Sequence, residues 1–403
     1  MVNPILLIAV GLGVAFLLPV IDRAGRIVSR TVHLLTLLFG LVVSLKWLAA
    51  LASGAQAAQI ITGGWLPPIG INLRFGPLEA ALVALANLTA IAAALYLANH
   101  EEQSTVKSLV IQLLLVIGAT GLIMTRDLFN TFVFLEISGI GSYAILAFGK
   151  ERDGLEAGFK YMALGSAAST FFLLGVAFLY KLTGTLNLDD MVGKLSGVTV
   201  AGVGTVLLLV MVGLMAELKL FPLNGPAIDI YDAAEPGVNA LLVGTTLNAL
   251  MFTFFKVMAL YRGNSWLLAI STVGMTTFVV CNLLAIRQKK VRRMLGYSSS
   301  AQMGLMIFLL PFIRTEVVLM SAMALILLNH TLAKAGLLWL AGIHGGRELD
   351  DWRGAFPDSI AMRVSLAVLI LAIAGLPPFP GFWGKWQALV GLARSTAWPW
   401  IIP

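Results

Sequence analysis

Charge is what this chain of 403 residues has least of. Aspartate, glutamate, lysine and arginine make up 12% of it, against 59% for hydrophobic residues. A soluble domain carries roughly 25% charged residues, so this composition excludes an ordinary soluble protein. Many long segments have almost no charge, and each is able to cross about 30 Å of hydrocarbon as a helix. The chain is therefore predicted to be an integral membrane protein.

Cysteine and histidine are also scarce, which limits the chemistry of the chain. The single cysteine, Cys281, excludes an internal disulfide and an iron–sulfur cluster held by this chain's own cysteines. The four histidines have no second His or Cys at metal-ligand spacing, so no metal site is predicted. No strand is predicted, and therefore no nucleotide-binding fingerprint that follows one. The chain is expected to hold no cofactor, to catalyse nothing alone and to bind no nucleic acid.

The apolar runs predict helices, because backbone in lipid must bond within its own segment and the runs lack the ten-residue alternation of a barrel. The first run has no basic leader or cleavage motif, so it is expected to be a retained span. The twelve predicted spans cover approximately residues 4–21, 31–51, 76–98, 107–125, 128–148, 159–181, 200–223, 238–261, 265–286, 297–313, 316–342 and 363–392.

The loops between these spans differ in charge. Connections after odd-numbered spans carry fifteen Lys and Arg residues, and those after even-numbered spans carry six. The largest cluster is RQKKVRR, residues 287–293. Positive residues favour the cytoplasmic side, so both termini are predicted on the outer side of a cell (inner) membrane. The polar loop 343–363 then faces inward, either as a contact for other subunits or as a solvated loop.

Prolines interrupt two of the predicted spans. Pro222 and Pro226 lie in LFPLNGPAID of the seventh span, and Pro377 and Pro378 lie in GLPPFPGFWGKW of the twelfth. Proline removes a backbone donor and clashes with the preceding turn. A helix break in a membrane survives only where protein or a wet cavity covers the released groups. Two broken helices in corresponding places also indicate an internal repeat of the kind that transporters have.

Titratable residues inside the spans are the second functional signal. A charge at the bilayer centre costs roughly 2.5–3.5 kcal/mol, so its retention indicates use. His330 and Lys334 are four residues apart and share a helix face, which suits a proton relay. Lys256 lies near a span end, where reaching out to the interface is an equal alternative. The candidate pathway residues are Glu136, Glu217, Lys219, Lys256, His330, Lys334 and Lys385.

Several stretches together resemble one family. They are RDLFNTFVFLEISGIGSYAIL, FKYMALGSAASTFFLLGVAFLYKLTGTLNL, LFPLNGPAIDIYDAAEPGVNALL, VRRMLGYSSSAQMGLM, LLNHTLAKAGLLWLAG and AGLPPFPGFWGKW. The chain resembles the antiporter-like, proton-pumping subunits shared by respiratory complex I, Mrp-type cation/proton antiporters and membrane-bound group 4 hydrogenases. The resemblance implies an all-α polytopic fold of two inverted five-helix repeats with a broken helix in each. The implied division is 1–100 for three N-terminal helices, 107–261 for the first repeat and 265–403 for a second, truncated repeat.

The resemblance also assigns residues, and here the chain departs from the family. Glu136, His330, Lys334 and Lys385 match family positions, but the lysine expected five residues before the first break is Glu217. The lysine or histidine expected in the eighth helix falls near Val243 to Asn248, where no residue titrates.

Two arrangements of the altered site stay open. In one, Glu136 and Glu217 face each other and share a proton. In the other, the helix break lets Lys219 turn back and pair with Glu136. Lys219 would otherwise lie on roughly the opposite helix face from Glu217.

The family usually has fourteen spans, and STAWPWIIP is a candidate start of a thirteenth. The closing helices are expected either on another polypeptide or to be missing. Partner membrane subunits are expected, including one that covers the truncated repeat, together with lipid and redox subunits on the cytoplasmic side. Iron–sulfur clusters or other redox centres are expected in those partners.

The leading functional hypothesis is a proton-translocating subunit, or one that exchanges Na⁺ for H⁺, in a redox-driven complex with an altered first half-channel. The alternative is a non-conducting scaffold subunit of the same complex. A third is a stand-alone transporter of an organic solute, which would need a polar midplane pocket instead of single titratable groups.

Overall fold

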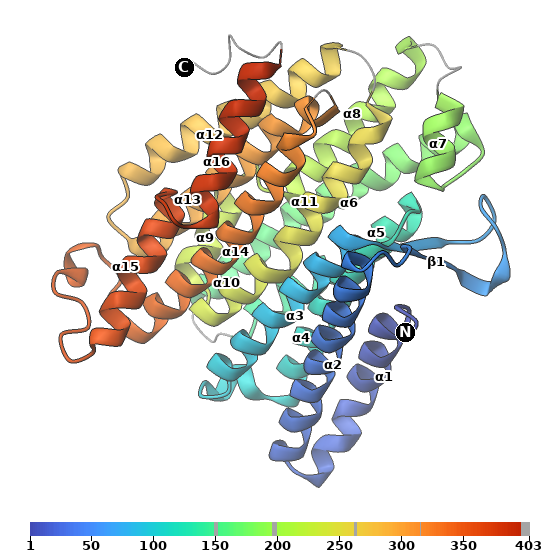
Figure 1. Ribbon diagram of the computed structural model, residues 1–403. Coiled ribbons are helices and arrows are strands. Elements are labelled where there is room, and N and C mark those ends of the chain that lie inside the picture. The colour runs from blue at the N-terminus through green and yellow to red at the C-terminus, as the bar shows by residue number, and fades with distance from the viewer. Residues whose placement is uncertain (149–151, 196–199, 262–263, 315, 396–403) are drawn as a thin grey trace. The chain divides into compact units, whose positions relative to one another are not determined.

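A computed structural model describes the whole chain except residues 149–151, 196–199, 262–263, 315 and 396–403 (Figure 1). The candidate thirteenth span therefore lies almost entirely outside the described residues. The chain forms two compact units. Unit 1 is Met1–Glu217 with Gly244–Leu260, and unit 2 is Leu218–Val243 with the chain from Tyr261 onward. The inverted relation of the two expected repeats and their boundaries stay predictions.

Ten helices of the described chain are long and apolar enough to cross a membrane, which confirms the helical, multi-pass fold. The remaining two predicted spans are the interrupted ones. Their apolar helices, Val203–Glu217 and Ile360–Ala374, are shorter and end before the prolines. The ten long helices are Leu6–Ala24, Arg26–Ala52, Pro77–Leu97, Val106–Met124, Leu128–Leu146, Gly154–Thr183, Pro236–Leu260, Ser265–Ile286, Val291–Arg314 and Val318–His344.

Each unit is described by its own elements (Figure 1). The elements of unit 1 are α1 (Leu6–Ile21), α2 (Arg26–Ala52), β1 (Ala58–Ile61), β2 (Asn72–Phe75), α3 (Pro77–Leu97), α4 (Val106–Met124), α5 (Leu128–Leu146), α6 (Arg152–Thr183), α7 (Leu188–Lys194), α8 (Val200–Glu217) and α11 (Asn248–Val257). Those of unit 2 are α9 (Gly225–Ala233), α10 (Pro236–Leu242), α12 (Asn264–Ile286), α13 (Val291–Leu309), α14 (Val318–His344), α15 (Ile360–Ala374) and α16 (Pro380–Arg394).

The expectation of no strands was wrong. β1 and β2 pair antiparallel, with Ala58 opposite Phe75 and Ile61 opposite Asn72. β2 alternates outward and inward side chains, and the ring of Phe75 packs edge-on against that of Trp47 on α2 at 5.9 Å. Each strand has only four residues, which is too short for an alternating pattern to stand out between apolar spans.

Polar side chains fix where two of the helices begin. The carboxylate of Asp127 accepts a bond from the backbone N–H of Asn130 at 2.7 Å at the start of α5. The carboxylate of Glu235 accepts from the N–H groups of Gly237 and Val238 at the start of α10. Such caps satisfy donors that have no partner inside the helix.

The basic stretch 287–293 is not all loop, because α13 begins at Val291, six residues before the predicted start. Its start is tied to the polar loop 343–363. The N–H of Val291 donates to the carbonyl of Arg347 at 3.0 Å, and the N–H of Leu349 donates to the carbonyl of Lys289 at 2.8 Å. The loop is thus part of the packed structure of unit 2 and not merely solvated.

Two packing features of unit 2 hold its helices together. An apolar core joins α10, α13 and α14, built from Ala240, Val243, Val291, Leu295, Ala335, Leu337 and Leu338. Glycines bring α12 and α13 into backbone contact. A Cβ atom on Gly274 would lie 2.4 Å from the backbone N of Phe308, and one on Gly304 would lie 2.7 Å from that of Phe278. Small residues allow such approach in membrane helix pairs.

Gly274→Ala is expected to destabilise the protein, because the new methyl group has to displace backbone of α13. Overpacking of this kind costs typically about 1–3 kcal/mol. The measurement is the thermal unfolding midpoint of the purified membrane complex. Gly204→Ala on α8 is the matched control, since a Cβ there meets nothing within 4 Å and alanine favours a helix. Equal midpoints for the two variants would contradict the close packing of α12 and α13.

Candidate functional site

The first helix break separates α8 from α9. α8 ends at Glu217, and Pro222 lies between the helices, whereas Pro226 lies in the first turn of α9, where proline needs no N–H partner. The released N–H of Phe221 donates to the hydroxyl of buried Thr277 on α12 at 3.2 Å. Protein thus covers the backbone opened by the break, as lipid surroundings require.

The second break separates α15 from α16, with Pro377 and Pro378 between them. Gly375 ends α15 with a φ of 80°, a conformation that glycine adopts without strain. Half-buried Lys385 of α16 reaches back to this end, and its Nζ donates to the carbonyl of Ala374 at 3.1 Å. A Cβ on Gly375 would lie 2.8 Å from that Nζ, so glycine also makes room for the lysine.

In unit 2 the structure connects His330 to a chain of hydroxyl groups. The Nε2 atom of His330 lies 3.1 Å from Oγ of Ser299 on α13, and the hydroxyl of Tyr231 on α9 donates to that Oγ at 2.9 Å. His330 is 1% exposed and Ser299 is 3% exposed. A Cβ on Gly296 would lie only 3.1 Å from Cβ of Tyr231, so a glycine at 296 allows α9 to approach α13.

Lys334 lies one turn further along α14 and is fully buried. Its Nζ donates to the carbonyl of Leu295 on α13 at 3.0 Å. The predicted pair His330 and Lys334 therefore faces one helix, α13, at neighbouring turns. Two titratable groups on one face can each influence whether the other holds a proton.

Charged residues gather where α9 meets the start of α13. Arg293 pairs with Asp229 at 3.0 Å and lies 3.6 Å from Asp232. Lys290 pairs with Asp232 at 2.9 Å. Tyr231 lies between these two aspartates in the sequence, so α9 carries both the start of the hydroxyl chain and the acidic part of this cluster.

Unit 1 holds the altered half of the predicted pathway. Glu217 is 4% exposed, whereas Glu136 on α5 is half-buried. A Cβ on Gly165 of α6 would lie 1.8 Å from Oη of Tyr143 and 3.4 Å from Oε1 of Glu217, so the phenol and the carboxylate approach the same point of α6. Tyr143 is seven residues after Glu136 on the same face of α5.

Lys219 is not on a helix, in contrast to the expectation from regular helical geometry. α8 ends two residues earlier, and Lys219 has a φ of 60°, which is unusual for a residue with a side chain. Helical periodicity therefore does not fix the direction of Lys219 relative to Glu217. The pairing of Lys219 with Glu136 and the proton shared by two glutamates both stay predictions.

Lys256 does not reach out to an interface. It is 5% exposed, and its Nζ donates to the carbonyls of Leu122, Ile123 and Thr125 at 2.7, 3.1 and 2.6 Å. An ammonium group has three protons to donate, and all three are used. These carbonyls lie at the end of α4, where a helix has no internal partners and its dipole is negative. Lys256 thus caps α4.

Near the expected eighth-helix base the backbone itself is irregular. A π-helical turn, Val243–Leu247, joins α10 to α11, and Asn248 follows it fully buried with its Nδ2 donating to the carbonyl of Gly244 at 3.0 Å. A Cβ on Gly244 would lie 2.0 Å from Oγ1 of Thr89 on α3. π turns are frequent at functional sites. In this chain the turn carries amide and hydroxyl groups.

Sequence reasoning missed Ser299 and Tyr231. Hydroxyl residues are common in membrane helices and are uncharged, so their presence in a span does not by itself indicate a function. Their role becomes visible only from the packing of α9 against α13. The quoted stretches that contain them, LGYSSSAQ and AIDIYDAAEP, were the available signal.

Helices broken in the membrane beside buried titratable residues define an antiporter-like membrane subunit. The chain belongs to the NADH:quinone oxidoreductase/Mrp antiporter transmembrane family, whose model matches residues 125–402. The resemblance drawn from the sequence stretches is confirmed.

Relatives of known class cover nearly the whole chain. NADH-quinone oxidoreductase subunit N of Desulforudis audaxviator is 30% identical over an alignment of 422 positions, gaps included. The alignment covers 99% of this chain and 82% of that protein. A Na(+)/H(+) antiporter component of Alkalihalophilus pseudofirmus is 29% identical over 341 residues, 81% of this chain and 68% of that protein. A chain of the membrane-bound sulfane sulfur reductase, an archaeal respiratory membrane complex, superposes with a TM-score of 0.90 at 31% identity, over 98% of this chain and 83% of that chain.

Lys256→Met is expected to destabilise the protein, because it leaves the buried carbonyls of Ile123 and Thr125 at the end of α4 without their donor. An orphaned buried polar group costs about 1–3 kcal/mol. The measurement is the thermal midpoint of the complex, with Lys107→Met, an exposed lysine on the same helix as those carbonyls, as the control. Loss of ion transport at an unchanged midpoint would instead place Lys256 in the ion pathway.

Proposed function

We propose that this chain is a proton-translocating, antiporter-like subunit of a redox-driven multisubunit complex, and that its unit 2 conducts. The observation that carries the proposal is the hydrogen-bonded chain from Tyr231 through Ser299 to buried His330. Its family and its relatives' names, which include quinone oxidoreductase and Na⁺/H⁺ antiporter subunits, support the same function.

The chain of hydroxyl groups is built for proton relay. A hydroxyl accepts a proton on a lone pair while it releases its own, so Ser299 takes a proton from Tyr231 and gives its own to Nε2 of His330. Tyr231 regains a proton from water held by the charged residues at the start of α13. No group then has to carry an isolated charge between the surface and the imidazole.

The route continues from the other side of the imidazole. Nδ1 of His330 is buried and has no hydrogen-bond partner among the described residues. Buried polar atoms of this kind are normally met by water. When Nε2 receives a proton from Ser299, the Nδ1 proton passes to a water, and the imidazole then returns to its starting tautomer before the next proton arrives.

Lys334 controls whether His330 keeps its proton. A charge on Lys334, one turn from His330, disfavours a second charge on the imidazole. A change in the carbonyl contact of Lys334 with Leu295 therefore releases or retains the proton on His330. Moving one charge against roughly 100 mV takes about 2.3 kcal/mol. A shift of about two units in one buried pKa supplies that amount.

Unit 1 differs because Glu217 and Asn248 stand where the family has titratable bases. Its half-channel is proposed to be altered, with the Glu136, Tyr143 and Glu217 group holding a proton in place of a glutamate–lysine pair. A non-conducting scaffold is the alternative, and the same residues motivate it.

The remaining features of the proposal follow from the family. Protons are the carried ion, with Na⁺ exchange as the Mrp-like variant. The iron–sulfur clusters or other redox centres lie in partner subunits of a complex I-like or group 4 hydrogenase-like assembly on the cytoplasmic side. Both termini lie on the outer side of the cell (inner) membrane, because the positive loops face the cytoplasm.

Lys334→Met is expected to lower the number of protons taken up per electron by the intact complex in sealed vesicles, because the coupling charge is lost. Lys289→Met, an exposed lysine of the basic stretch, is the control and should behave as the wild type. Unchanged pumping in Lys334→Met would establish the scaffold alternative.

Ser299→Ala is expected to slow proton uptake by about tenfold or more, since it removes the hydroxyl between Tyr231 and His330. Ser299→Thr keeps a hydroxyl and should restore part of the rate. Ser300→Ala, the buried neighbour on α13, is the matched control. Wild-type rates in Ser299→Ala would rule out this relay.

A further inference from the structure

The bundle of α2, α3 and α4 in unit 1 has a polar interior, although it lies outside both broken helices. The residues concerned are 3% exposed or less: Ser29, His33, Ser44, Asn87, Thr89, Ser108, Gln112 and Thr120. Polar groups in a membrane bundle are costly unless each has a partner. Each of these side chains therefore needs hydrogen-bonding groups within the bundle.

The polar residues of α4 lie on one helix face. Ser108, Gln112 and Thr120 are separated by multiples of four residues. α2 packs against α4, and near their starts Nη2 of Arg30 donates to Oγ of Ser104 at 2.7 Å. The polar faces of the two helices therefore begin at the same end of the bundle.

Three buried atoms of this interior have no hydrogen-bond partner among the described residues. They are Nε of Arg30, Nε2 of His33 and Oε1 of Gln112. The amide nitrogen of Gln112 is already used, because it donates to Oγ of Ser108 at 3.2 Å and to the carbonyl of Gln103 at 3.3 Å. A missing donor for Gln112 and a missing partner for an imidazole nitrogen both point to water, which donates and accepts.

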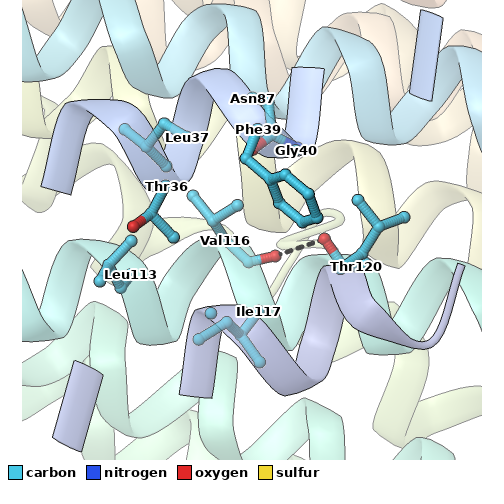
Figure 2. Close-up of a pocket in the computed structure, with 11 residues that line it drawn as sticks. Thr36, Leu37, Phe39, Gly40, Asn87, Leu113, Val116, Ile117 and Thr120 are labelled. Atoms are coloured by element: carbon cyan, nitrogen blue, oxygen red, sulfur yellow. Dashed lines mark hydrogen bonds between the residues drawn. The ribbon is translucent and has the colours of Figure 1, made fainter. Parts of the chain in front are cut away.

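A cavity of about 20 Å³ lies among α2, α3 and α4 and is also lined by Leu7 and Gly11 of α1. Figure 2 draws the residues that line it. Leu37 lines it four residues after His33, and Val116 lines it four residues after Gln112. Asn87 and Thr120 also line it, and the hydroxyl of Thr120 donates to the carbonyl of Val116 at 2.8 Å, which leaves its lone pairs to accept. The volume is enough for a water molecule beside polar groups.

Gly40 contributes the room for this arrangement. A Cβ at Gly40 would lie 2.4 Å from Oδ1 of Asn87, so the side-chain carbonyl of Asn87 faces the bare backbone of α2 across the cavity wall. Nδ2 of Asn87 donates to the carbonyl of Val83 at 2.8 Å. The asparagine is thereby held with its oxygen toward α2.

We propose that these side chains form a binding site for a short column of water molecules between α2, α3 and α4. The column begins at half-buried Arg30, passes His33 and Gln112, and ends in the cavity beside Asn87. It places hydrated, titratable His33 in the three N-terminal helices, away from the relay in unit 2. The proposal does not depend on that relay, and pumping defects in Lys334→Met leave it untouched.

X-ray radiolytic footprinting of the intact complex tests the column, because bound water yields hydroxyl radicals that label the side chains beside it. Leu37 and Leu113 line the cavity and are 2% and 1% exposed, and Leu18 on α1 is fully buried outside it. Leu37 and Leu113 are expected to be labelled at least fivefold faster than Leu18. Equal labelling of the three leucines would overturn the proposal.

Gln112→Leu provides the second arm, since it removes an atom that the water is proposed to satisfy. Labelling of Leu37 in this variant is expected to fall toward that of Leu18. Ser44→Ala is the control, because its hydroxyl already donates to the carbonyl of Gly40 at 2.8 Å and it does not line the cavity. Undiminished labelling in a folded Gln112→Leu protein would contradict the role of Gln112, and if that variant does not fold, the wild-type comparison decides alone.

Discussion

Backbone carbonyls bind three lysines that are buried or half-buried in this protein, and much of its site depends on that interaction. Lys256 donates to the end of α4, Lys385 to the end of α15, and Lys334 to a carbonyl of α13. In lipid, neither an ammonium group nor a helix end can rely on water, so each satisfies the other. Lys256 uses all three of its protons, so loss of one would break one of its bonds to the backbone.

Much of the fold and part of the site could be predicted from the sequence. Apolar runs located most of the spans to within a few residues, because burial in hydrocarbon demands length and lack of charge. The start of α13 and the end of α8 differ more from the prediction. Prolines located both breaks, since their missing donor acts locally. His330 and Lys334 were expected on one face from their spacing alone, and the structure places both against α13.

The rest depends on contacts between elements that are distant in sequence. The bond between Tyr231 and Ser299 exists only because α9 packs against α13, and the capping role of Lys256 needs the end of α4, more than 130 residues earlier. Lys219 was misplaced because the helix was assumed to continue to the proline, whereas it ends at Glu217. The hairpin and the π turn are too short for a hydrophobic periodicity to predict them from the sequence.

The backbone departs from a regular α-helix at each place where the chain passes from one unit to the other. It leaves unit 1 after Glu217 at the helix break, returns through the π turn Val243–Leu247, and leaves again after the 3₁₀ turn Met258–Leu260. The helix break, the π turn and the 3₁₀ turn lack the regular hydrogen bonds of an α-helix. At each of the three crossings the backbone therefore departs from the regular α-helical hydrogen-bond pattern.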